Sequence, residues 1–317
     1  MIRILRTSGN KDKKKKIVIL TGPTSSGKTN LSIELARRYQ TEIISADSMH
    51  VYKSFDIGTG KPSKNIMNTI PHHLIDIIQP DKDFDAWQYM KLSRDVINSS
   101  LNENLIVSGG TQLYIKSLLD GLTSELPKDD DFRKTLQDKL ESNGIDHLYN
   151  MLLEIDPDQA KKINNRDIQR IIRFLEINKI TQRKPSELFR EENRTTLKDC
   201  QFIKIGLSIS KPQLDDLINL RVDTMISDGL IDEVKSLVEL YGEEIKPLRS
   251  IGYKEICMYL KGDFTKDESI EKIKTNTRRL AKRQTTWLRK DEEMVWFENV
   301  KALTEYSDKF VSNWLSF

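Results

Sequence analysis

The segment GPTSSGKT, residues 22–29, decides the fold of this chain. It matches the phosphate-loop pattern GxxxxGK[ST] in full, and the glycines of that pattern let successive backbone N–H groups point at phosphate oxygens. An apolar run over 17–21 precedes it and a helical pattern starts at Lys28, which is the strand–loop–helix context that such a loop requires. The segment therefore predicts a site for a ligand that carries at least a diphosphate. We expect contacts from each of its residues: Gly22, Pro23, Thr24, Ser25, Ser26, Gly27, Lys28 and Thr29.

Two side chains of the loop add chemistry of their own. Lys28 supplies a positive charge to the terminal phosphate, and the Thr29 hydroxyl is suited to bind Mg²⁺. The positive end of the following helix adds to the attraction for an anion. We therefore expect Mg²⁺ as the cofactor, with Thr29 as its protein ligand.

Strands and helices alternate on either side of the loop. Further strands are expected over 42–46, 74–78, 105–107, 201–208 and 294–297. Helices are expected over 85–101, 211–228, 230–241, 251–260 and 268–290, with one more at the end of the chain. This alternation predicts an α/β fold, a P-loop NTPase-like parallel sheet with flanking helices.

Residues 128–190 interrupt this alternation, because they show helical spacing and many charges with breaks at Gly144, Pro157 and Pro185. We interpret them as an all-helical insertion domain. The chain then divides into a basic flexible arm over 1–16, a first part of the core over 17–125, the helical insertion over 126–200, and a second part of the core with basic C-terminal helices over 201–317.

Composition limits the class of protein. Of the 317 residues 37% are hydrophobic and 31% charged, and the net charge is only +3, so the distribution of charge must decide whether nucleic acid binds. Cys200 and Cys257 lack the spacing of a zinc site or disulfide framework, and no apolar run is long enough to span a bilayer. We expect a monomeric cytoplasmic protein.

Polar residues end two neighbouring strands at the edge where open α/β sheets bind ligands. Asp47 and Ser48 follow the strand over 42–46, and Gly109-Gly110-Thr111 closes the strand over 105–107. Asp47 could accept a proton from an attacking nucleophile, or it could simply cap a turn. The second group could hold a leaving diphosphate, or Thr111 could cap a helix.

The reaction is less defined than the ligand. An ATPase or GTPase usually adds a strand that ends in a Mg²⁺-holding aspartate, whereas the strand over 105–107 ends in Ser108 and two glycines. Asp76 could serve, but it sits in the middle of its expected strand. These features disfavour nucleotide hydrolysis and leave a P-loop kinase of a small molecule as an alternative.

The helix over 268–290 carries a nearly single-signed basic face, which favours contact with polynucleotide phosphate over a plain solvated surface. Its basic residues are Lys272, Lys274, Arg278, Arg279, Lys282, Arg283, Arg289 and Lys290. The insertion adds further arginines that are mixed with acids.

An ordered series of segments resembles the tRNA dimethylallyltransferase (tRNA isopentenyltransferase, IPP transferase) family in its bacterial type, which lacks the zinc-finger extension of eukaryotic members. Beyond the phosphate loop these are ISADSMHVYK at 44–53, DIGTGKP at 56–62, PHHLIDI at 71–77, VSGGTQLYIKSLLDGL at 107–122, DIQRIIRFLEI at 167–177, LRSIGYKE at 248–255 and LAKRQTTWLRK at 280–290. The resemblance implies transfer of the dimethylallyl group from dimethylallyl diphosphate to N6 of the adenine 3′ of the anticodon, in tRNAs that read codons beginning with U. Prenylation of free adenine nucleotides, or a non-catalytic RNA-binding module, stay open as alternatives.

The resemblance also implies roles for individual residues. Asp47 matches the general base, and Thr111 and Arg249, with Lys28 of the loop, complete the expected catalytic set. Contacts to tRNA are expected from Asp47, Ser48, Met49, His50, Thr111, Arg133, Gln169, Arg170, Ile171, Ile172, Arg173 and Arg283. Two positions depart from the family pattern: His50 stands where many members carry Gln, and Gly60 replaces a commoner Ala.

Overall fold

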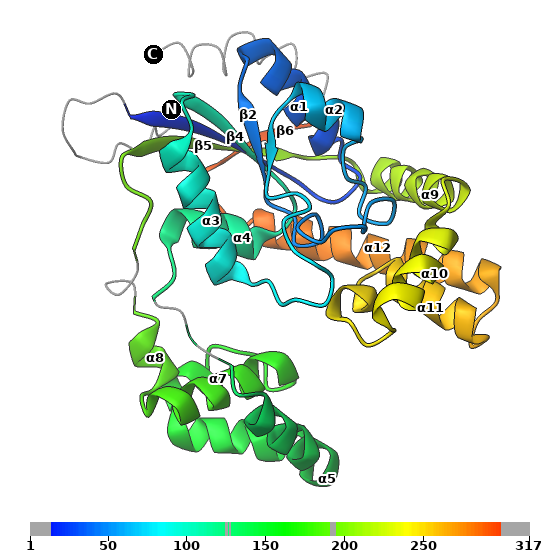
Figure 1. Cartoon of the computed structure of the whole chain (residues 1–317). Helices are drawn as coiled ribbons and strands as arrows, with labels where there is room; N and C mark the ends of the chain where they lie inside the picture. The colour runs from blue at the N-terminus through cyan, green and yellow to red at the C-terminus, as the bar shows by residue number, and fades with distance from the viewer. Residues whose placement is uncertain (1–13, 124–125, 127, 191–194, 299–317) are drawn as a thin grey trace. The chain divides into compact units, whose positions relative to one another are not determined.

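The computed structural model describes residues 14–123, 126, 128–190 and 195–298 (Figure 1). Most of the predicted arm and the expected terminal helix lie outside the described residues. Lys15 and Lys16, which we assigned to the arm, begin strand β1 (Lys15–Thr21).

A six-stranded sheet in the order β3-β2-β4-β1-β5-β6 forms the centre of the first of two compact units, and its neighbouring strands pair in parallel. Its strands after β1 are β2 (Glu42–Ser45), β3 (His72–His73), β4 (Asn104–Ser108), β5 (Cys200–Leu207) and β6 (Met294–Phe297). The helices that precede the insertion are α1 (Lys28–Tyr39), α2 (Lys64–Thr69), α3 (Ala86–Ser99) and α4 (Gln112–Asp120). Those that follow it are α9 (Lys211–Ser227), α10 (Leu230–Tyr241), the 3₁₀ helix η2 (Lys246–Arg249), α11 (Tyr253–Lys261) and α12 (Lys266–Leu288).

The sheet is buried on both faces, as the alternation along β1 shows. Ile17 and Ile19 belong to one apolar cluster, whereas Val18 and Leu20 belong to another that includes α1. Successive side chains of a strand point to opposite faces, and parallel sheets need cover on both. These features confirm the P-loop NTPase-like α/β fold predicted from the sequence.

Residues Leu74–Ile78 do not form the predicted third strand. The strand in that place is the short β3, and Ile78 makes only an isolated bridge to Tyr52. Leu74 and Asp76 have φ angles of 62° and 55°, which are left-handed and incompatible with a strand. The segment is instead a partly buried loop, in which Leu74 is buried, Ile77 is exposed, and the Asp76 N–H donates to the His50 carbonyl at 3.0 Å.

Residues Asp120–Thr196 form the second unit. It contains α5 (Asp130–Ile155), α6 (Pro157–Ala160), α7 (Ile168–Thr181) and α8 (Pro185–Leu188), which pack around an apolar core of their own that includes Leu136, Leu148 and Leu175. The breaks predicted from sequence occur, since Gly144 is non-helical inside α5 and Pro157 and Pro185 begin helices. Among the described helices of the chain, none combines the length and apolarity needed to cross a membrane.

Candidate functional site: a cavity beside the phosphate loop

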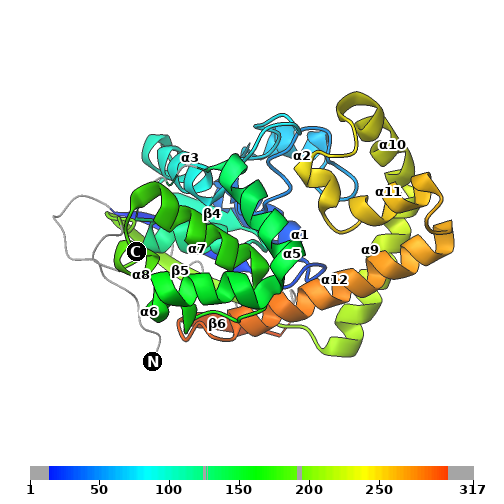
Figure 2. The same cartoon turned by 90° about the horizontal axis from the view of Figure 1, so that it is seen from below.

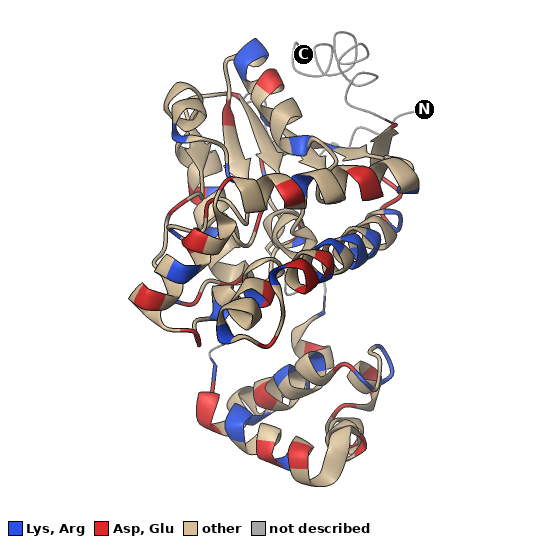
Figure 3. Cartoon of the chain, turned by 90° about the vertical axis from the view of Figure 1, so that its right-hand side faces the viewer, with Lys and Arg blue, Asp and Glu red and all other residues tan. Residues whose placement is uncertain are grey.

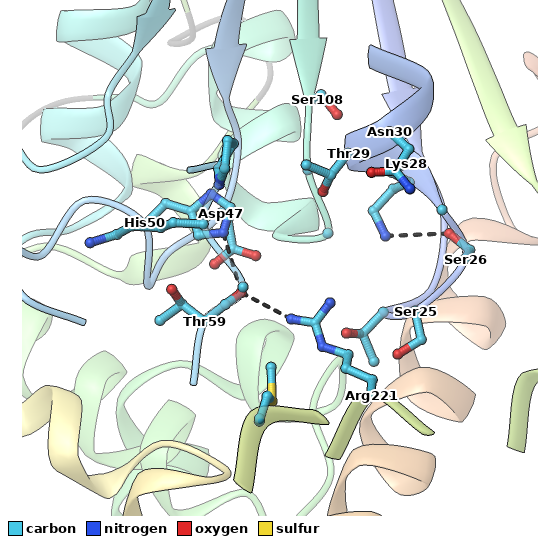
Figure 4. Close-up of a pocket in the computed structure, with 18 of the residues that line it drawn as sticks. Ser25, Ser26, Lys28, Thr29, Asn30, Asp47, His50, Thr59, Ser108 and Arg221 are labelled. Atoms are coloured by element: carbon cyan, nitrogen blue, oxygen red, sulfur yellow. Dashed lines mark hydrogen bonds between the residues drawn. The ribbon is translucent and has the colours of Figure 1, made fainter. Parts of the chain in front are cut away.

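A cavity of about 640 Å³ lies at the carboxyl edge of the sheet (Figure 4). Loop residues 24–30, the ends of β2 and β4, segment 57–63, and parts of α9 and α12 line it. Figure 2 shows α9 crossing α12, and the two helices pack on each other. The cavity thus brings together segments from both parts of the core, separated in sequence by the helical unit.

The phosphate loop joins β1 to α1 as the sequence predicts, and Thr24 to Thr29 line the cavity. The Lys28 ammonium folds back over the loop, where Nζ donates to the Pro23 carbonyl at 2.6 Å. Burial lowers the pKa of Lys28 to about 7, against the opposing charge of Asp47, and Arg221 lowers it further. Near neutral pH Lys28 is therefore only partly protonated, and an anion bound at the loop would stabilise its protonated, positively charged form.

Asp47 lies two residues beyond the end of β2 and faces the cavity from the side opposite Lys28 (Figure 4). One of its oxygens, Oδ1, accepts the Met49 N–H at 2.9 Å. Asp47 therefore caps a turn and lines the cavity at the same time, so the cap leaves the role of proton acceptor open to it. A turn-bound carboxylate has a fixed orientation, which suits it to accept a proton from a group held in the cavity.

Thr111 acts on this turn rather than lining the cavity. Its hydroxyl accepts the Ser48 N–H at 2.9 Å, and its own N–H donates to the Ala46 carbonyl at 3.0 Å. The end of β4 is thereby tied to both residues that flank Asp47.

Arg221 on α9 is a cavity residue that sequence reasoning missed. It lines the cavity between Asp47 and the phosphate loop (Figure 4), and Nη2 donates to the Thr59 carbonyl at 3.0 Å. Burial lowers the pKa of its guanidinium, against the charge of Asp47, yet an arginine remains charged at neutral pH. The only hint in the sequence is one arginine that follows two leucines of α9, Leu217 and Leu220, which also line the cavity.

Arg249, by contrast, is not among the described residues that line the cavity. It ends η2 with a side chain that is 67% exposed, and Nη2 pairs with a Glu244 carboxylate oxygen at 3.0 Å. The diphosphate contact expected of Arg249 fits the position of Arg221 better.

Gln284 is a second residue that the sequence did not single out. From α12 its amide spans two loops, since Oε1 accepts the Thr24 N–H at 2.9 Å and Nε2 donates to the Gly110 carbonyl at 3.1 Å. The Gln284 side chain therefore links the phosphate loop to the segment that follows β4.

His50, the departure from the family pattern, is buried in the cavity wall. Burial lowers its pKa, although Asp47 acts in the opposite direction, so the ring is neutral near pH 7. In that form Nε2–H donates to the Thr59 carbonyl at 3.4 Å and Nδ1 accepts from the Ser45 hydroxyl at 3.0 Å.

Two of the three arginines predicted to contact RNA in the helical unit, Arg133 and Arg173, meet at one buried carboxylate. Glu176 has a fully buried side chain that accepts from Arg133 Nε at 2.7 Å and from Arg173 Nη1 at 2.5 Å. Burial alone would raise the pKa of Glu176, but these partners hold it below its usual range. Of the neighbouring residues, Gln169 and Arg170 are exposed, whereas Ile171 is wholly buried in the core of the unit. The prediction that Ile171 touches RNA is therefore wrong for its side chain.

The basic face of α12 is visible in Figure 3 as a run of lysines and arginines. Two of its predicted members are partly buried and have partners within the chain, because Lys274 pairs with Asp223 at 2.8 Å and Arg278 donates to Asn219 at 2.6 Å. Two exposed members also have partners, since Arg279 donates to Asn276 at 3.4 Å and the Lys272 ammonium lies 4.4 Å from the centre of the Phe264 ring. The other exposed members are Lys282, Arg283, Arg289 and Lys290.

The oxygens around the phosphate loop fit Mg²⁺ better than a softer metal. Thr29 and Asp47 line the same cavity, and hydroxyl and carboxylate oxygens are ligands that Mg²⁺ prefers. Within the described ranges, no cluster of three or more His, Cys, Asp or Glu side chains could hold a metal. His72 Nδ1 lies 2.7 Å from the Ile70 carbonyl oxygen, and His73 Nε2 lies 2.8 Å from a Glu42 carboxylate oxygen.

Comparison with known proteins identifies relatives over most of the chain. A family model described as IPP transferase matches residues 50–291. The tRNA dimethylallyltransferase 2 of Geotalea uraniireducens is 43% identical over 89% of this chain and 92% of its own length. The crystal structure of the tRNA isopentenylpyrophosphate transferase from Bacillus halodurans is 36% identical, with a TM-score of 0.69 over 96% of this chain and 97% of that one. A eukaryotic dimethylallyltransferase solved acting on tRNA gives a TM-score of 0.76 at 28% identity, over 94% of this chain and 77% of that one.

Proposed function

This chain belongs to the IPP transferase family, and we propose that it transfers the dimethylallyl group from dimethylallyl diphosphate to N6 of an adenine in tRNA. One observation carries the proposal: a single cavity holds the phosphate loop, Asp47 and Arg221. That arrangement offers an anion cradle and a fixed carboxylate on opposite sides of one space. The acceptor that the sequence resemblance implies is the adenosine just 3′ of the anticodon in tRNAs that read codons beginning with U.

The reaction follows from what each side of the cavity can stabilise. The lone pair of the N6 amine forms a bond to C1 of the donor, and the C1–O bond breaks with its electron pair going to the diphosphate. Asp47 accepts the proton that N6 loses. Lys28, Arg221 and the loop N–H groups stabilise the negative charge that develops on the leaving diphosphate.

Mg²⁺ would supply further charge neutralisation for the diphosphate when bound. Thr29 is the residue that would hold it, because its hydroxyl lines the cavity beside the loop. A site with one or two protein oxygens is typical of Mg²⁺ that is otherwise bound by substrate phosphates.

The acceptor is proposed to be RNA because the exposed basic residues of α12 belong to the helix that lines the cavity through Leu280 and Gln284. Such a face attracts polynucleotide phosphate, and a base in an anticodon loop must leave its stack to reach a recessed site. The exposed Gln169 and Arg170 and the paired Arg133 and Arg173 offer contacts from the helical unit.

A P-loop kinase is the main alternative, and Asp76 argues against it. Asp76 has a left-handed backbone conformation, and its carboxylate pairs with Lys61 Nζ at 2.6 Å. It is not among the described residues of the cavity wall, so it could not serve there as the Mg²⁺-holding aspartate of a nucleotide hydrolase or kinase.

Incubation of the protein with Mg²⁺, dimethylallyl diphosphate and unmodified tRNA tests the proposal, with AMP and ATP as competing acceptors. We expect diphosphate release together with a dimethylallyl mass increase on adenosine in tRNA. The Asp47→Ala variant should be roughly 10²–10⁴-fold slower if the carboxylate is the base. ATP consumption without prenyl transfer would contradict the proposal. Prenylation of AMP or ATP in preference to tRNA would show that the acceptor is a free nucleotide.

A cytoplasmic location and a monomeric state are part of the same proposal. Neither Cys200 nor Cys257 forms a disulfide, which suits a reducing compartment. Sedimentation at micromolar concentration tests the monomer.

A further inference from the structure

One wall of the cavity is a loop, residues 55–61, held from behind by a single carboxylate. Glu233 lies in the first turn of α10 and reaches this loop across more than 170 positions of sequence. Its Oε2 accepts the Asp56 and Ile57 N–H groups at 3.1 and 2.7 Å, and its Oε1 accepts the Gly58 N–H at 3.2 Å. Three consecutive backbone donors thus converge on one side chain.

Tyr253 completes this arrangement from α11. Its hydroxyl donates to Glu233 Oε1 at 2.6 Å, so each of the two carboxylate oxygens accepts two hydrogen bonds. Burial and the adjacent charge of Glu233 raise the pKa of Tyr253, which keeps the hydroxyl protonated as a donor. Hydrogen bonds to an ionised acceptor are roughly twice as strong as neutral ones.

The packing around the loop is equally specific. A Cβ atom at Gly58 would lie 2.5 Å from the Tyr253 ring, and that ring also packs against Phe55 with centroids 4.7 Å apart. Lys61, whose side chain is 2% exposed, ties the far end of the loop to Asp56 at 2.9 Å. The loop is therefore held by contacts at its start, its middle and its far end.

The loop matters to the cavity through a carbonyl group. The Thr59 oxygen accepts from Arg221 Nη2 at 3.0 Å, and a Cβ atom at Gly60 would lie 2.5 Å from the same nitrogen. Glu233 itself is not among the described residues that line the cavity. A continuous chain of contacts nevertheless runs from Glu233 through residues 56–59 to the guanidinium.

We propose that Glu233 is a positioning residue that holds the loop over 55–61 so that the Thr59 carbonyl aims Arg221 at the diphosphate. This rests on the proposed function insofar as a diphosphate is the ligand, but not on which acceptor is prenylated. If Glu233 acts through Arg221, removing both must cost no more than removing Arg221 alone.

A double-mutant cycle tests this with inorganic diphosphate and Mg²⁺ as the probe, by calorimetry on the full chain. Glu233→Gln keeps the shape but replaces one acceptor oxygen by a donor, so two hydrogen bonds are lost. We expect the Kd for diphosphate to rise roughly tenfold in the wild-type background, and less than about twofold in an Arg221→Ala background. Glu239→Gln, an exposed position on the same helix, is the matched control and should leave the Kd unchanged.

A purely structural role would give a different pattern. Equal losses with and without Arg221, or no loss for Glu233→Gln, would overturn the proposal. Tyr253→Phe provides a milder variant if Glu233→Gln folds poorly, because it keeps the ring and removes one bond; a roughly two- to threefold rise that vanishes in the Arg221→Ala background is expected. A wild-type protein that binds diphosphate but transfers no prenyl group would contradict the proposed function while leaving this cycle interpretable.

Discussion

Gly109 offers the sharpest test of how the cavity is held together. A Cβ atom at this position would lie 2.2 Å from the Ala46 carbonyl oxygen, some 1.2 Å closer than the 3.4 Å at which ordinary contact begins. The obstacle is backbone of the residue before Asp47, so no rotamer change relieves it. Gly109→Ala must therefore separate the ends of β2 and β4 and strain the bond from the Thr111 N–H to Ala46.

The size of the effect follows from that displacement. Loss of two backbone hydrogen bonds, from the Thr111 N–H to the Ala46 carbonyl and from the Ala46 N–H to the Ser108 carbonyl, should together with residual strain destabilise the protein by about 2–4 kcal/mol. A loss of that size lowers Tm by roughly 5–15 °C. A shift of Asp47 by about 1 Å should lower kcat/KM for prenyl transfer by roughly 100-fold. Diphosphate-release kinetics with tRNA and a thermal unfolding scan measure the two.

Gly110→Ala is the matched control for this prediction. Its Cβ atom would lie 2.7 Å from Gln284 Nε2, the mobile end of a side chain that can move aside. We expect about 1–2 kcal/mol of destabilisation from the lost Gln284 bonds and a smaller loss of activity. A Gly109→Ala protein as active as wild type, or a Gly110→Ala protein equally impaired, would refute the reasoning.

Three further predictions concern charge. Because Lys28 has a pKa of about 7 when the cavity is unfilled and its protonated form attracts the anion, diphosphate affinity should be greatest below pH 7 and fall as pH rises above it; Lys28→Arg, compared by calorimetry between pH 6 and 9, should flatten that dependence. Glu176→Gln leaves Arg133 and Arg173 without their buried carboxylate and should destabilise the helical unit by about 3–5 kcal/mol, seen as an earlier unfolding transition; an unchanged transition would contradict a structural role for the cluster. Arg283→Gln should reduce the slope of log Kd for tRNA against log salt by about one, with diphosphate affinity unchanged; an unaltered slope would remove Arg283 from the RNA surface.

The sequence revealed those parts of the site that are local in the chain. The phosphate loop carries its strand, glycines and helix within one short segment, and Asp47 follows a strand whose apolar run is equally plain. The last strand, Met294–Phe297, was also predicted with the bounds that the structure has. Each of these depends on spacing between neighbours, which a single sequence records.

The residues that were missed act across long separations. Arg221 meets Thr59 across 162 positions, and Gln284 meets Thr24 across 260. Nothing along the chain marks such a partner, because an arginine or glutamine in a helix usually faces solvent. The error at 74–78 has the same origin: a short apolar run is compatible with a strand, but the left-handed φ of Leu74 depends on contacts that sequence spacing does not report.

The join between the core and the helical unit has a consequence for how such a protein can change. The Leu197 N–H donates to the Leu119 carbonyl at 2.9 Å, so the chain leaves the core and returns to it at one point. The cost of closing a loop grows only slowly with its length, and insertions at such a point put little tension on the sheet. The segment between Leu119 and Leu197 could therefore be lengthened, exchanged or deleted in evolution while the cavity beside the phosphate loop kept its geometry.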